Sequence, residues 1–131
     1  MKLALTFGIV ALILTTQAFA ADGTVMQSNS PVLFKGTVCK TQHAAESIYR
    51  AHQSGGYTAA LQRLKSLQQP PAGASLCSTG TWYLTPKRRI SSFVGLHIPE
   101  SILPFTGHVL EVEMAERTFY ALSRVDLDLH V

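Results

Sequence analysis

The pattern of hydrophobic and polar positions predicts a strand followed by two helices. Residues 32–39 are apolar and rich in β-forming side chains, although Gly36 weakens the strand or marks a bulge. Residues 42–53 then place their apolar side chains on one stripe at helical spacing, and residues 58–69 repeat that pattern. Gly55-Gly56 separates the two stripes, so we expect an antiparallel helical hairpin that returns the chain to the end of the first strand.

After residue 75 the pattern changes to alternation with a period of two, which is typical of strands in a sheet with one solvated face. Pro86 is expected to break the first of these segments and Pro99 to close the second. The predicted strands cover residues 76–85, 90–98, 107–114, 117–125 and 125–131. The composite is an α+β domain in which a disulfide-clasped two-helix hairpin packs against a small antiparallel sheet, curled in the manner of an SH3-like barrel.

The first twenty residues have the three-part plan of a secretory signal peptide. Lys2 supplies the positive start, residues 3–14 are apolar, and Ala18-Phe19-Ala20 offers small residues at a cleavage site. The apolar run is shorter than the roughly twenty residues that a membrane span needs, although a retained N-terminal anchor is the competing interpretation. We therefore expect an exported, periplasmic or secreted protein with no membrane span after cleavage. Its parts are a signal peptide over residues 1–20, a flexible leader over residues 21–30 and a single domain over residues 31–131.

Two cysteines, Cys39 and Cys77, lie just outside the two ends of the predicted helical hairpin. A hairpin would bring them together, and an exported protein with two cysteines is expected to pair them in an oxidising compartment. In the chain-entropy model, a disulfide that closes a loop of this length stabilises the fold by ~4 kcal/mol. The sequence has no C-x-x-C motif, so we expect a structural bond and not a redox centre.

Charge is unevenly distributed along the chain. The sequence has 11 Lys and Arg against 8 Asp and Glu, a formal net charge of +3. Residues 35–89 hold most of the cations with Glu46 as their single acid, whereas residues 100–128 are mainly acidic. Either these charges neutralise each other within the fold, or a basic face meets an anionic polymer or an acidic protein. Nucleic acid is the weakest of the partners, because the net charge is low and no nucleic-acid motif accompanies it.

The predicted turn between the first two strands of the sheet carries the strongest candidate binding site. Adjacent cations would attract an anionic partner, and exposed aromatic rings beside them would stack on a sugar, a peptide or a side chain. The alternative is that the rings belong to the core and the cations to a solvated turn. The residues of this site are Lys87, Arg88, Arg89, Trp82 and Tyr83, with Phe93 on the far side of the turn.

Carboxylates and imidazoles offer weaker candidates for chemistry. Asp126, Asp128 and His130 alternate along the last predicted strand, an arrangement that suits a divalent metal or an acid–base pair. The same alternation near a chain end also arises from solubility alone. A pairing of His97 or His108 with Glu111 is the other candidate, and His43 and His52 point to opposite sides of one helix. No nucleophile, zinc or phosphate-loop motif is present, so no catalytic residue, metal or cofactor is assigned.

These observations favour a small exported protein that acts as a non-catalytic binding or interaction module of the cell envelope. Its expected partner is an envelope protein or an anionic polymer. An accessory or inhibitory protein that docks on a partner through the hairpin or a sheet edge is the first alternative. A small hydrolase or metal-dependent enzyme is the second. The residues leave the oligomeric state open.

Overall fold

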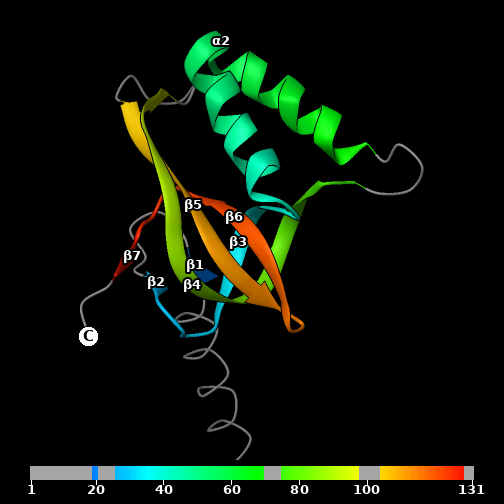
Figure 1. Ribbon diagram of the computed structural model, residues 1–131. Helices are drawn as coiled ribbons and strands as arrows, with labels where there is room; N and C mark the ends of the chain where they lie inside the picture. Colours follow the sequence, from blue (N-terminus) through cyan, green and yellow to red (C-terminus); the bar gives the residue numbers. More distant parts are fainter. Residues whose placement is uncertain (1–18, 21–25, 70–74, 98–103, 129–131) are drawn as a thin grey trace, which may run out of the picture.

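The computed structural model describes residues 19–20, 26–69, 75–97 and 104–128 of the 131-residue chain (Figure 1). Within those ranges the chain forms one kinked helix and seven strands. In chain order they are β1 (Phe19–Ala20), β2 (Met26–Gln27), β3 (Val32–Cys39), α2 (Gln42–Gln68), β4 (Cys77–His97), β5 (Pro104–Met114), β6 (Arg117–Ser123) and β7 (Leu127–Asp128). The α+β class predicted from the sequence is confirmed.

Four of these strands close into a ring. β3 runs antiparallel to β4, β4 to β5, and β5 to β6. β6 then returns to β3, where Val38 lies opposite Ala121 and Cys39 opposite Tyr120. β4 joins two parts of the ring, because its first half pairs with β3 and its second half with β5. The small antiparallel sheet expected from the sequence is therefore a closed ring.

The predicted strand break at Pro86 and turn at residues 87–89 are wrong. β4 is a single strand of 21 residues that runs through both. Its register with β5 shifts between Pro86 and Arg88 and again between Arg89 and Ser91. A β-bulge tolerates proline, because the missing N–H falls where the ladder of hydrogen bonds is already interrupted. The irregularities therefore allow one strand to continue where alternation and proline together predict two.

Side chains directed into the ring form the first hydrophobic core. Met26 of β2 and Leu127 of β7 belong to it, because these two short strands pair in parallel beside the ring. Residues 26–30, predicted as part of a flexible leader, are thus attached to the ring, and residues 21–25 lie outside the described ranges. The buried members of this core are Met26, Val32, Phe34, Val38, Leu84, Leu110, Val112, Ala121 and Leu127.

The helical segment is one helix with a kink, so the predicted two-helix hairpin is wrong. α2 spans 27 residues and leaves helical geometry only at Gly56, whose φ of 81° costs glycine little. The kink is sharp, because Arg63 Nε donates to Ser47 Oγ at 3.0 Å, whereas sixteen residues of straight helix span roughly 24 Å. The diglycine therefore bends the helix without ending it, and the chain still returns to the ring (Figure 1).

α2 packs on the outer face of the ring and creates a second hydrophobic core. Tyr49 makes the closest contact: its ring lies against Gly107, and its hydroxyl donates to the carbonyls of His108 (3.4 Å) and Ser123 (3.3 Å). A side chain at Gly107 would occupy the space of the Tyr49 ring. The buried members of this core are Cys39, Ala44, Ala45, Ile48, Tyr49, Ala60, Leu67, Cys77, Leu96 and Val109.

A buried carboxylate also joins α2 to β4. Glu46 accepts hydrogen bonds from Ser91 Oγ (2.8 Å), Gln42 Nε2 (3.1 Å) and Arg50 Nη2 (3.2 Å). Burial alone would raise the pKa of Glu46, but these hydrogen bonds and the Arg50 charge outweigh it and hold the pKa below its usual value. The carboxylate is therefore ionised at neutral pH and fixes the first turns of α2 over the strand.

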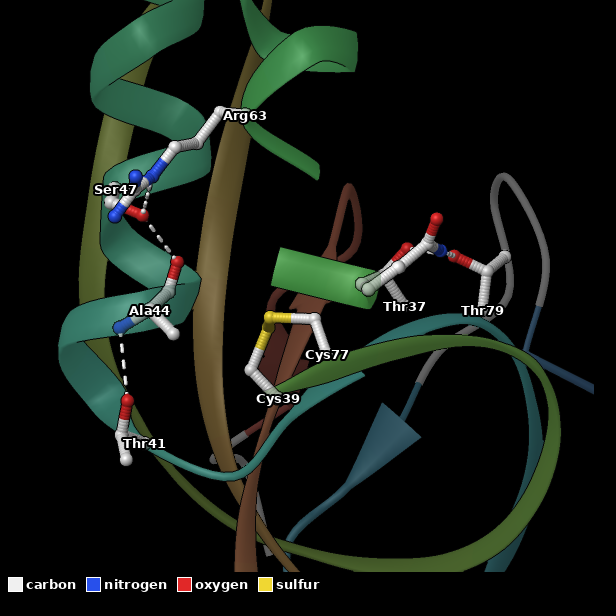
Figure 2. The surroundings of a disulfide bond; sticks show 9 residues. Thr37, Cys39, Thr41, Ala44, Ser47, Arg63, Cys77 and Thr79 are labelled. Carbon is white, nitrogen blue, oxygen red and sulfur yellow. Dashed lines mark hydrogen bonds between the residues drawn. A yellow bond between two sulfur atoms is a disulfide. The ribbon is translucent and has the colours of Figure 1, made fainter. Parts of the chain in front are cut away.

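Cys39 and Cys77 form the predicted disulfide at the point where the chain leaves and rejoins the ring (Figure 2). The two residues are opposite each other in the β3–β4 register, with their Cα atoms 4.0 Å apart, and both are buried. Beside them the Lys40 N–H donates to the Leu76 carbonyl at 2.7 Å, and the Leu76 N–H to the Leu67 carbonyl at 2.9 Å. The segment between β3 and β4, which contains α2, is thus held at its two ends by a disulfide and by hydrogen bonds.

Gly107→Ala is expected to loosen α2 from the ring. A Cβ at this position would lie 2.6 Å from the Tyr49 ring and 2.7 Å from Leu96 Cδ1. We expect the free energy of unfolding in urea to fall by about 1–3 kcal/mol, the usual cost of overpacking. Gly80→Ala is the matched control, because its Cβ would meet the Trp82 ring at an ordinary 3.7 Å. Equal losses in the two variants would contradict this account of the α2 contact.

Candidate functional site

The predicted basic residues lie in β4, where each contacts a carboxylate from the acidic half of the chain. Partly exposed ion pairs of this kind add little stability. They do, however, cancel much of the positive field that three adjacent cations would create. The basic half and the acidic half of the sequence therefore pair their charges between neighbouring segments of the fold. The pairs are Lys87 Nζ–Glu113 Oε1 (3.4 Å), Arg88 Nε–Glu111 Oε1 (3.0 Å) and Arg89 Nη1–Asp126 Oδ2 (2.9 Å).

The aromatic residues of the predicted site are separated by the fold. Trp82 and Tyr83 are successive residues of a strand and point to opposite faces of it. Tyr83 is 68% exposed, whereas Trp82 packs against the ring core and donates its Nε1–H to the Gly36 carbonyl at 3.0 Å. Phe93 belongs to the second core, with its ring centroid 5.4 Å from that of Tyr49. Of the three rings, Trp82 and Phe93 therefore pack against the two cores, and Tyr83 is the one that is largely exposed.

Trp82 instead forms a wall of an open pocket, which we call the Trp82 pocket. The pocket has a volume of about 150 Å³ and mainly apolar walls. The ladder between β4 and β5 begins at Thr85 opposite Glu113, and the pocket lies beyond that end of the ladder, beside the first half of β4. Its lining residues are Val38, Cys39, Lys40, Ser75, Leu76, Ser78, Trp82, Met114 and Phe119.

A glycine of β3 makes room for an aromatic side chain near this pocket. Gly36 and Gly80 are opposite each other in the β3–β4 register. A Cβ at Gly36 would lie 2.9 Å from Phe34 Cζ, and one at Gly80 would rest against the Trp82 indole. The register is continuous at Gly36, so this glycine does not mark the bulge that the sequence left open. The absence of a side chain at Gly36 admits the Phe34 ring, and the Gly36 carbonyl accepts the Trp82 Nε1–H.

Polar residues also belong to the lining of the Trp82 pocket. Lys40 and Ser78 are exposed there, and Leu76 is 40% exposed. The backbone of Lys40 is held in place by the adjacent disulfide and by its hydrogen bond to Leu76. Four ion pairs form among the described residues, and the Lys40 ammonium takes part in none of them. The lining of the pocket thus combines mainly apolar walls with one exposed lysine.

A second apolar groove, of about 170 Å³, lies between the two arms of α2. It follows from the kink at Gly56, which separates the arms. His52 is buried in its wall and meets the Tyr57 ring edge-on at 6.3 Å between centroids, whereas His43 on the same helix is exposed. The groove is lined by Ile48, Tyr49, His52, Tyr57, Ala60, Leu61 and Leu64.

A hydrogen-bonded serine–histidine pair is the feature that the sequence did not predict. Ser92 and His108 are opposite each other in the β4–β5 register, with Oγ 2.8 Å from Nδ1. Burial lowers the pKa of His108; the Asp126 carboxylate opposes this shift and Arg89 adds to it. The pair is a hydrogen-bonded contact between the two strands.

The remaining candidates for chemistry lie only partly within the described residues. Asp126 is held by its ion pair and accepts a backbone N–H at 2.7 Å, and Asp128 lies on β7. His130 lies outside the described residues, His97 is the last residue of β4, and Glu111 forms an ion pair with Arg88. No group of three metal-ligating side chains occurs within the described ranges.

Comparison of the chain with protein-family models, with curated proteins and with solved structures finds no match. Across residues 19–20, 26–69, 75–97 and 104–128, no helix has both the length and the apolar character that crossing a membrane requires. Function is therefore inferred from the residues and their geometry.

Stability is expected to fall as the pH drops from about 7 to about 5, because the unfolded chain protonates His108 more readily than the folded protein does. The sign follows from the lowered pKa: the contribution is complete above the unfolded value and is lost as the pH falls towards the folded value. His108→Gln should therefore flatten the dependence of the unfolding free energy on pH in urea titrations. His43→Gln, at an exposed position of α2, is the control. An unchanged slope in His108→Gln would contradict a neutral, buried His108.

Proposed function

We propose that the protein is a small exported binding module of the cell envelope that holds an apolar group of its ligand in the Trp82 pocket. One observation carries the proposal. Trp82, Met114 and Phe119 are large apolar side chains, yet they stay half-buried around an open space instead of closing over it. Ligand sites are commonly concave and apolar, with a few polar groups that fix orientation. The Trp82 pocket has this composition.

Export is supported by two independent features of the chain. The first twenty residues have the plan of a signal peptide. The buried Cys39–Cys77 bond is of the kind that persists in an oxidising compartment. We therefore place the protein in a periplasm or outside the cell.

The cations of β4 give weaker support for the binding of an anionic polymer. Lys87, Arg88 and Arg89 each have a carboxylate partner, so an incoming polyanion would have to compete with the protein's own acids. Recognition through the apolar pocket does not require those pairs to break. We therefore favour the pocket over the charged strand as the binding site, and we expect occupation of the pocket by an uncharged group to depend little on salt.

Fluorobenzene, an uncharged apolar probe, tests occupation of the pocket. In protein labelled with ¹³C at its methionine methyl groups, the Met114 resonance is expected to shift on titration, because this side chain lines the pocket. Met26 lies in the same ring core without lining the pocket, so its resonance serves as an internal control. A titration that moves neither methyl, or both equally, would contradict the proposed site.

A pocket-filling variant provides the second test. Ser78→Leu places an apolar side chain at the rim and is expected to abolish the Met114 shift. Thr118→Leu makes the same kind of change at an exposed position of β6 outside the pocket and should leave the shift intact. Retention of the shift in Ser78→Leu would argue that the probe binds elsewhere.

A further inference from the structure

We propose that the group bound in the Trp82 pocket belongs to a small single-ring aromatic carboxylate. This inference rests on the proposed function and names the chemistry of its ligand. Cavities of about 150 Å³ with apolar walls accept a single benzene ring. The Trp82 pocket has this volume, so one ring fills it and a second ring would protrude into solvent.

The walls favour an aromatic ring over an alkyl chain. Trp82 and Phe119 offer an indole and a phenyl ring, whose preferred contacts are the offset and edge-on arrangements with another ring. Met114 adds a thioether, which makes favourable contacts at the edge of an aromatic ring. Trp82 is also fixed in place, because its Nε1–H donates to the Gly36 carbonyl. The binding surface is therefore preformed on at least one side.

The rim supplies the charge that selects a carboxylate. Among the nine described residues that line the pocket, Lys40 is the single charged one, and no acid accompanies it. Its ammonium takes part in none of the four ion pairs of the described residues. Ser75 and Ser78 belong to the same lining, and a serine hydroxyl can donate a hydrogen bond. A ligand with its ring inside and its carboxylate at the opening satisfies both parts of the site.

The test compares 3-phenylpropionate with 3-phenylpropan-1-ol, which has the same ring and chain but no charge. Both should shift the Met114 methyl resonance. In low salt the acid should bind about three- to fivefold more tightly, the size expected for a partly exposed ion pair. Lys40→Gln should remove this preference without abolishing binding. Lys35→Gln, an exposed lysine of β3 that does not line the pocket, should retain it.

The two proposals fail in different ways. Equal binding of the acid and the alcohol to the unaltered protein, or an acid preference that survives Lys40→Gln, would overturn the carboxylate assignment and leave the pocket as a binding site. Failure of both compounds to shift Met114 would overturn both proposals. Much tighter binding of a peptide that ends in phenylalanine, such as Gly-Gly-Phe, would overturn the small-molecule assignment in favour of a chain terminus.

Discussion

The disulfide between Cys39 and Cys77 is the constraint on which the rest of the structure depends. It joins the last residue of β3 to the first residue of β4, which are already opposite each other in the sheet. All of α2 lies between them in sequence, so the disulfide, which we call the clasp, holds both ends of the α2 segment (residues 40–76) at one place. Two residues away, the hydroxyls of Thr37 and Thr79 meet at 2.8 Å and continue the same register (Figure 2).

The position of the clasp also explains the candidate site. Cys39 and Lys40 lie at the end of β3, and Ser75 and Leu76 lie just before β4. The disulfide brings these two segments together, and both line one side of the Trp82 pocket. The opposite walls come from Met114 of β5 and Phe119 of β6, and β6 pairs with the end of β3 at Val38 and Cys39. The pocket thus forms because β6 pairs with β3 at Cys39, whereas β4 and β5 are no longer paired beyond Thr85 and Glu113.

Local patterns predicted the parts of this fold that local physics decides. The α+β class, the first strand and the cysteine pairing follow from periodicity and spacing, and the structure confirms them. The helical hairpin failed because Gly56 can take a positive φ without ending the helix. The basic turn failed because bulges carry β4 through Pro86. The Trp82 pocket and the Ser92–His108 pair depend on register between distant strands, which alternation along one segment does not encode.

Native-state hydrogen exchange tests most directly whether the clasp makes α2 and the ring one unit. With the disulfide intact, the most protected amides of α2 are expected to exchange at the same free energy as those of β3 and β4. In a Cys39→Ala, Cys77→Ala double variant, α2 should exchange at a lower free energy than the ring strands, because its ends are no longer tied. Unchanged protection of α2 relative to the ring in that variant would contradict the account.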